Sequence, residues 1–423
     1  MPRVRELEVF RLVLPYGRRP ESILVKLTDY GGMTGWGEVV QSPDRRLARP
    51  GASGAATAQA EMGRQQDRTA QAGTADQRGT AREGMSREGT AREGMSREGM
   101  SREGMSREGM SREIQGSAES ERDHLLAKTW ATLEESLAPA LLGVDWEHPD
   151  ELGTVPGGTA VDLACWDLWT RMRGVPLAYA LGGTRTSVMA TVRLAAERSL
   201  EAMVARVNRH VCAGYAHVTL DVHPGWDVEP VRAVRQAYPA LALAVDGRGA
   251  YTETTALEAL DAYDVTAIER PFGGPEFPAD LDLHAELQGR VSSLVAIEVH
   301  SVAELDEAIA ARAASALLLR PSRFGSLRAV RTAHDRALAA GWDITAAGGR
   351  GTGLARAATV AVASLPGCTL PSDVTEPPRS AQIVTPPVGA SGGVVAVPLT
   401  QSGLGHIVDE DRVRRLASDS FKL

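Results

Sequence analysis

The sequence has no long apolar run and no excess of positive charge, and each absence narrows the class of protein. No stretch approaches the ~20 consecutive apolar residues that cross a bilayer, and the start, MPRVRELEVFRLVL, lacks the apolar core of a signal peptide. The net charge of −8 and a sequence pI near 5.7 argue against nucleic-acid or anionic-membrane partners. We therefore expect a soluble cytoplasmic protein with neither a nucleic-acid nor a membrane partner.

Cysteines are few, and two common functional motifs receive no support from the sequence. The three cysteines, Cys165, Cys212 and Cys368, are odd in number and lie in apolar or helical contexts, so we expect buried free thiols in a reducing compartment. Ser322 and Ser326 do not lie within a G-x-S-x-G motif, so nothing marks either of them as a nucleophile. The glycine-rich pieces GGTR and GGRGTG lack the lysine of a nucleotide-binding loop.

What the sequence does contain is a series of short apolar runs between residues 219 and 320, each ending in a polar residue. Amphipathic stretches such as VEPVRAVRQAY and SVAELDEAIAARA separate them, with apolar residues at helical spacing. This alternation predicts parallel βαβ units closed into a (β/α)8 barrel. The active-site face of such a barrel lies at the carboxyl ends of the strands, so the polar strand-end residues should meet in one mouth. They are Asp221, Asp246, Glu269, Glu298 and Arg320.

Smaller elements flank the barrel and predict an α+β capping domain. VRELEVFRLVL at 4–14 and ILVKLTDY at 23–30 read as paired strands, with GGMTGWGE turning into a third. Two helical stretches follow, the second broken at Gly174–Pro176. We assign 1–44 and 120–186 to the capping domain and 187–375 to the barrel, with VMATVRLA as first strand and CTLPSD as eighth. The tail, 376–423, should return to the capping domain.

Residues 45–119 differ in character from the rest and predict a disordered low-complexity insert. From Gly79 to Glu113 the chain consists of seven tandem pentads, GTARE or GMSRE. A glycine every fifth residue costs ~1 kcal/mol each in a helix, and the period matches neither helix nor strand. Such a segment buries too little apolar surface to order itself. Repeat expansion in a tolerant surface loop is favoured over a flexible interaction arm.

Several motifs together carry a family resemblance. They are WGE at Trp36–Glu38, ACWDLW at Ala164–Trp169, ALGGTR at Ala180–Arg185, VDGRGAYT at Val245–Thr252, IERP at Ile268–Pro271 and ASLPGCTLPSD at Ala363–Asp373. With the strand and helix order, they make the chain resemble the enolase superfamily, in the branch of o-succinylbenzoate synthase and N-acylamino acid racemase. The resemblance implies one Mg²⁺ held by acids at the ends of strands three, four and five. It also implies that a lysine removes the proton α to a substrate carboxylate.

The metal ligands implied by the resemblance transfer only in part. Asp246 matches the first ligand and Glu269 the second, whereas the third falls at Ala296. Glu298 lies two positions later, on the same side of the strand but about 7 Å further along, and could supply a displaced ligand.

The positions that would move the proton are all altered. Thr219 and Asp221 stand where the family has the two lysines of strand two, and Arg320 replaces the lysine of strand six. Arginine stays protonated and cannot act as a base at neutral pH. The seventh-strand segment GGRGTG, which contains Arg350, lacks the family's acid. We predict metal-assisted dehydration or epimerisation that is weak or lost; the alternative is an inactive relative that binds a small carboxylate or serves as a partner subunit.

Each candidate residue also has a structural interpretation. Asp221 could act as a general base or pair with Arg320, and Arg320 could clamp a substrate carboxylate or pair with Asp221, Asp246 or Glu269. Asp246 and Glu269 could bind Mg²⁺ or be neutralised by Arg248 and Arg270. Thr219, Arg248 and Arg350 are the candidate substrate-binding residues. A homo-oligomer is compatible with all of these readings.

Overall fold

The computed structural model describes residues 2–14, 21–41, 129–152, 158–273, 280–349, 351–376 and 378–423. The chain divides into two units, Met1–Arg46 with Glu121–Leu423, and Leu47–Ser120. Everything below concerns the first unit. The predicted repeat insert, 45–119, and the candidate residue Arg350 lie outside the described residues.

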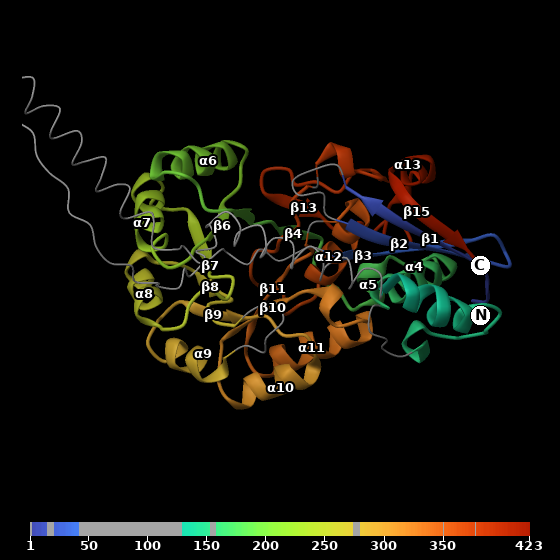
Figure 1. Cartoon of the computed structure of the whole chain (residues 1–423), viewed down its shortest axis with the longest axis horizontal. Coiled ribbons are helices and arrows are strands. Elements are labelled where there is room, and N and C mark those ends of the chain that lie inside the picture. The colour runs from blue at the N-terminus through green and yellow to red at the C-terminus, as the bar shows by residue number, and fades with distance from the viewer. Residues whose placement is uncertain are drawn as a thin grey trace, which may run out of the picture. The chain divides into compact units, whose positions relative to one another are not determined.

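The capping domain is built on an antiparallel sheet of four strands. The strands β1 (Val4–Val13), β2 (Glu21–Asp29) and β3 (Thr34–Gln41) follow one another as a meander. The tail adds β15 (Ala417–Lys422) beside β1, so the order is β15-β1-β2-β3. The C-terminal segment therefore completes the sheet that the N-terminus begins (Figure 1).

The glycines around Trp36 are explained by the helix that packs on β3. That helix, α4 (Thr159–Arg173), is mostly buried. A Cβ at Gly37 would lie 1.9 Å from the carbonyl oxygen of Ala160, and one at Gly35 would lie 2.3 Å from that of Ala164. Only glycine allows the strand to approach the helix backbone this closely.

Shorter helices complete the capping domain. The predicted break is confirmed, because α4 ends at Gly174, which has a left-handed φ of 67°, and Pro176 precedes α5 (Leu177–Ala180). Before α4 lie three short helical segments: η1 (Leu133–Leu137), α3 (Ala138–Leu141) and η2 (Pro149–Leu152).

Seven parallel strands follow one another in sequence order and form the barrel wall. They are β5 (Val192–Leu194), β6 (His217–Asp221), β7 (Ala242–Asp246), β8 (Ala267–Glu269), β9 (Leu294–Ile297), β10 (Ala316–Leu319) and β11 (Asp343–Ala346). Parallel bridges Ala347–Asp373 and Ala190–Ser372 place residues 372–373 between the last strand and the start of the first. The predicted α/β fold, a (β/α)8-type barrel with an α+β capping domain, is confirmed.

Helices lie outside the parallel strands (Figure 1). They are α6 (Leu200–Cys212), α7 (Val228–Ala237), α8 (Thr255–Glu258) with η3 (Ala259–Tyr263), α9 (Leu281–Gln288), α10 (Val302–Ala310), α11 (Leu327–Ala339) and α12 (Gly353–Ala363). Ser199, Ser301 and Ser326 cap the starts of α6, α10 and α11 by accepting a backbone N–H of the first turn, a contact that contributes about 1 kcal/mol each. These caps begin helices soon after strands end, which keeps the βα loops short.

The first barrel strand is shorter than predicted. Residues Ser187–Met189 form β4, which pairs antiparallel with β13 (Val394–Ala396) of the tail. The barrel strand β5 begins only at Val192, so the prediction of one strand over VMATVRLA is wrong. The partner of β4 is a tail strand far along the chain. The apolar pattern of a short segment cannot predict such a pairing. The rest of the tail contains η5 (Arg379–Ala381), β12 (Val384–Thr385), β14 (Ile407–Val408) and α13 (Glu410–Leu416).

The cysteines are free thiols, and two of the three are buried. Cys165 and Cys368 lie in the core as predicted, whereas Cys212 is exposed at the end of α6. Its prediction was wrong because the last turn of α6 presents it to solvent, with its Sγ 3.7 Å from Asn208 Oδ1. No helix in the part of the chain that the structure describes has the length and apolarity to span a membrane.

A buried acid links the capping domain to the barrel. Asp162, in the first turn of α4, accepts the backbone N–H of Leu327 at the start of α11 over 2.7 Å. Burial raises the pKa of this carboxyl to about 7, against the effect of that hydrogen bond, and the neighbouring Asp150 adds to the rise. The charged form is therefore costly in the folded protein.

The replacement Asp162→Asn should flatten part of the pH dependence of stability. A folded-state pKa raised from 3.8 to about 7 means that the stabilisation by this group is complete at low pH and is lost as pH rises through 7. Between pH 4 and pH 8 the variant should therefore gain about 2–4 kcal/mol in unfolding free energy relative to the natural chain. Urea denaturation at several pH values measures this. The exposed replacement Asp411→Asn is the control, and parallel pH profiles for the natural chain and Asp162→Asn would contradict the assignment.

Candidate active site

Three acids lie side by side at the carboxyl ends of β6, β7 and β8. Asp221 is in register with Asp246, and Asp246 with Glu269. All three are buried, at 4%, 0% and 3% exposure. Parallel strands bring their ends to one edge, so three short apolar runs that each end in an acid place three carboxylates together.

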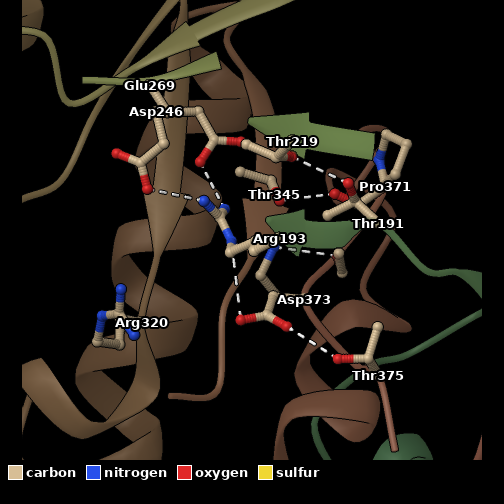
Figure 2. Close-up of polar contacts among 12 residues, drawn as sticks. Thr191, Arg193, Thr219, Asp246, Glu269, Arg320, Thr345, Pro371, Asp373 and Thr375 are labelled. Atoms are coloured by element: carbon tan, nitrogen blue, oxygen red, sulfur yellow. Dashed lines mark hydrogen bonds and ion pairs between the residues drawn. The ribbon is translucent and has the colours of Figure 1, made fainter. Parts of the chain in front are cut away.

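An arginine from the first barrel strand, β5, reaches past the neighbouring strand β6 to two of these acids. Arg193 of β5 donates from Nη1 to Asp246 Oδ2 at 3.0 Å and from Nη2 to Glu269 Oε2 at 2.5 Å. Its Nε lies 3.7 Å from Asp373 Oδ2. Figure 2 shows the guanidinium between Asp246 and Glu269 on one side and Asp373 on the other.

A second arginine bridges the acids of neighbouring strands. Arg270, directly after β8, donates to both oxygens of Asp246, at 3.2 and 2.5 Å, and to Glu298 Oε2 at 3.1 Å. Its φ of 45° is in the left-handed region, as is the φ of 49° at Arg248. Such a conformation costs a non-glycine residue about 1 kcal/mol or more, so the surrounding contacts hold both arginines in place.

Glu298 is surrounded by guanidinium groups. It follows β9 directly, and its Oε1 accepts from Arg320 Nε at 2.8 Å and from Arg323 Nε at 3.3 Å, while Oε2 accepts from Arg270. The position in register with Glu269 is Ala296, which is fully buried. The acid two residues further along therefore serves three arginines.

The remaining candidates have partners other than those predicted. The guanidinium Nε of Arg248 lies 2.9 Å from Asp221, and Arg320 pairs with Glu298. The predictions that Asp221 pairs with Arg320 and that Arg320 pairs with Asp246 or Glu269 are wrong, because Arg248 follows the adjacent strand and lies closer. Asp246 is neutralised by Arg270 as anticipated, but Arg248 reaches it only through its backbone N–H, at 3.0 Å from Oδ1.

Thr219 lies deeper in the barrel than the charged residues. It is 1% exposed, and its hydroxyl is 2.9 Å from the hydroxyl of Thr191. Close to these two hydroxyls in Figure 2, Thr345 of β11 donates to the carbonyl of Pro371 at 2.8 Å. These hydroxyls are satisfied by protein atoms, so Thr219 stays a predicted substrate-binding residue without a contact that reaches the mouth.

Together these charged side chains form what we call the arginine–acid cluster. Among the residues that the structure describes, it contains six guanidinium groups and five carboxylates. The members are Arg193, Arg248, Arg270, Arg320, Arg323 and Arg356 with Asp221, Asp246, Glu269, Glu298 and Asp373.

Burial and the charges of the cluster shift the pKa values of its acids in different directions. Burial acts to raise the pKa of Asp246, but Arg270 and Arg193 outweigh it and bring the value to about 2. Burial is likewise outweighed at Glu298, where Arg320 and Arg270 hold the pKa well below its ordinary value of 4.5. At Asp221 burial wins and raises the pKa, although Arg248 opposes the rise. Burial also raises the pKa of Glu269, although Arg193 opposes the rise. Asp246 and Glu298 are thus firmly ionised, while Asp221 and Glu269 are easier to protonate.

The residues of the mouth do not fit a divalent metal ion as they stand. Mg²⁺ requires near-octahedral oxygen ligands. Both oxygens of Asp246 and one of Glu269 already accept from guanidinium groups, and those groups carry the positive charge that an ion would bring. Among the described residues, no group of three or more histidines, cysteines or acids is placed to hold a metal.

Comparisons with known proteins agree with this architecture. A sequence profile described as "Enolase C-terminal domain-like" matches residues 202–412. An o-succinylbenzoate synthase from Geobacillus kaustophilus is 30% identical over 300 residues, which cover 68% of this chain and 79% of that protein. An N-succinylamino acid racemase from Thermus thermophilus is 31% identical over 291 residues, or 66% of this chain and 78% of that protein.

Solved structures show the same fold. An enolase-superfamily member from Listeria innocua superposes with a TM-score of 0.75 at 20% identity, covering 100% of this chain and 99% of its own. The fold and the relatives define a barrel protein with a capping domain. The chain belongs to the enolase superfamily, and o-succinylbenzoate synthases and N-succinylamino acid racemases are among its relatives.

Four members of the cluster were not singled out from the sequence: Arg193, Arg323, Arg356 and Asp373. Arg193 stands in the apolar run TVRLA, and Asp373 ends the motif that also served the family resemblance. The available signal was the charge itself, because an arginine within a buried strand requires a buried acid as partner. The pattern gives no indication of which acids those are.

The replacement Glu298→Gln should destabilise the protein at neutral pH. It leaves three guanidinium groups without their shared counter-charge, and breaking a buried pair of this kind costs about 3 kcal/mol. A pKa held below 4.5 means that the stabilisation exists at neutral pH and is lost as pH falls, so the difference from the natural chain should shrink below pH 4.5.

Chemical denaturation at pH 7 and at lower pH measures both effects. Glu229→Gln, which changes an exposed pair with Arg232 on α7, is the matched control and should leave stability nearly unchanged. A Glu298→Gln variant as stable as this control at pH 7 would show that the cluster does not depend on Glu298.

Proposed function

We propose that this chain is a member of the o-succinylbenzoate synthase and N-succinylamino acid racemase branch that has lost metal-assisted α-proton abstraction and binds a small carboxylate at its barrel mouth. One observation carries the proposal. The acids at the ends of β7 and β8, Asp246 and Glu269, are bonded to the guanidinium groups of Arg193 and Arg270. The positive charge that a metal would supply is already covalently attached to the chain.

The absence of lysine from the barrel range of the sequence supports the same proposal. The only lysines in the sequence are Lys26, Lys128 and Lys422, so the barrel range contains none. Arginine cannot lose its proton in the way a catalytic amine does. If this chain were an active enzyme, it would have to abstract the α-proton of its substrate without lysine, the residue type on which the branch relies.

Asp221 supplies a second candidate function, weak metal-independent proton exchange. Burial raises its pKa, and one of its oxygens, Oδ1, is buried without a hydrogen-bond partner in the described structure. A carboxylate with one unengaged oxygen can accept a proton from a bound acid. The observation favours residual exchange at most, because the same pair with Arg248 stabilises the carboxylate that would act as base.

The guanidinium groups around Glu298 support a carboxylate as the ligand. Three arginines contact the carboxylate of Glu298, and Arg323 is the most exposed of them, with 32% of its side chain accessible. Arg323 lies in η4 (Pro321–Arg323), which follows β10 directly. A planar guanidinium fork matches a carboxylate bidentately, so an incoming anion would be attracted to this exposed group.

A binding titration tests the carboxylate site. Isothermal titration with succinate and with an N-succinylamino acid, in EDTA and in Mg²⁺, should give the same affinity in both buffers. Arg323→Gln should weaken binding at least about tenfold, the loss expected for one charge-assisted contact. Arg336→Gln removes an exposed guanidinium that pairs with Asp306 on the outer helices and is the matched control. Affinity that depends on Mg²⁺, or that Arg323→Gln leaves unchanged, would contradict the proposal.

An exchange experiment separates the two candidate functions. The α-proton of the same N-succinylamino acid is followed by NMR in heavy water with the natural chain and with Asp221→Asn. No exchange supports the binding function, and metal-independent exchange that Asp221→Asn abolishes supports the second candidate. Exchange that requires Mg²⁺ would overturn the proposal that the ancestral reaction is lost.

A further inference from the structure

Arg193 holds together three acids that come from separate strands. Asp246 ends β7, Glu269 ends β8, and Asp373 follows the bridge that closes the barrel beside β11. Each approaches a different nitrogen of the guanidinium, at 3.0, 2.5 and 3.7 Å. Figure 2 shows Asp246 and Glu269 on one side of the Arg193 guanidinium and Asp373 on the other.

The contacts of the three acids outside Arg193 are unequal. Asp246 also bonds Arg270, and Asp373 also bonds Arg356 at 3.3 Å. For Glu269 the described structure gives no other side-chain contact than the one with Arg193. Without the Arg193 side chain, Glu269 would face Asp246 in a buried site with little compensation. A buried group of acids then recruits a cation, a proton or both.

We propose that the Arg193 side chain is a built-in substitute for a divalent cation, and that Asp246, Glu269 and Asp373 form a divalent-metal site once that side chain is removed. The inference rests on the proposed metal-free mouth. It goes further by naming the residue whose guanidinium lies between the acids, where an ion would bind, and by assigning a third ligand, Asp373, at the closing strand. Oxygen-only ligands, with water completing the shell, suit Mg²⁺ or Mn²⁺.

Replacing Arg193 by serine creates space as well as negative charge. The guanidinium and two methylenes disappear from a site where the side chain is only 13% exposed. An ion with its retained waters can then occupy the volume between the carboxylates. Arg270, Arg248 and Arg356 keep their contacts, so the ion would share Asp246 with Arg270 and Asp373 with Arg356.

Manganese binding is the direct test. The full-length chain and its Arg193→Ser variant are titrated with Mn²⁺ and followed by electron paramagnetic resonance, which distinguishes bound from free ion. The variant should bind one Mn²⁺ at least about tenfold more tightly than the natural chain, and Mg²⁺ should compete for the site. Arg248→Ser, which removes a guanidinium of the same mouth that pairs with Asp221, should gain no binding.

Further variants keep the test decisive if Arg193→Ser is unstable. Mg²⁺ should then raise the melting temperature of Arg193→Ser but not that of Arg193→Lys, which keeps a cation in the site. Adding Asp246→Asn to Arg193→Ser should abolish the gain. Equal binding by Arg193→Ser and Arg248→Ser, or no binding and no thermal shift with Arg193→Ser, would overturn the inference.

The outcomes also separate this inference from the proposed function. Tight Mn²⁺ binding by the natural chain would contradict both. A natural chain that binds no metal, together with an Arg193→Ser variant that also binds none, would leave the metal-free function standing and refute only the role of Arg193.

Discussion

The pairing of Arg193 with Asp246 and Glu269 is the interaction on which the arrangement of the barrel mouth depends. The parallel strands place these acids next to each other, and they are 0% and 3% exposed. A carboxylate removed from water costs several kcal/mol unless a positive charge lies beside it. In this chain the charge comes from β5, which is separated from β7 by β6, so a single ion-pair set connects strands that are not neighbours in the sheet.

The same constraint explains why the cluster extends beyond three residues. Once Arg193 satisfies Glu269, Asp246 is shared with Arg270, and Arg270 in turn reaches Glu298. Each further acid in the cluster pairs with a further arginine. The last of these arginines, Arg323, lies nearest the surface. Networks of this kind are stabilising only when every member is satisfied, since removal of one partner leaves an uncompensated buried charge. The mouth is accordingly preorganised around its own ions, and the partly exposed guanidinium of Arg323 at the rim is the natural contact for a ligand anion.

The acids of the mouth could be anticipated from sequence, whereas their partners could not. Asp221, Asp246 and Glu269 end apolar runs, and the geometry of parallel strands makes their meeting a local consequence of that pattern. Which arginine each acid meets depends on side-chain reach across the barrel. That is why Arg320 was assigned to the wrong acids and Arg193 was not considered at all. The division of VMATVRLA had a similar cause, because β4 pairs with β13, a tail strand far along the chain.

The most direct test of a mouth neutralised by arginine is a crystal structure of the natural chain grown with manganese, with anomalous data collected at the manganese edge. The account predicts no anomalous peak between Asp246 and Glu269, and the Arg193 guanidinium in density within hydrogen-bond distance of both acids. A manganese peak at that position, with the Arg193 side chain turned away, would contradict it.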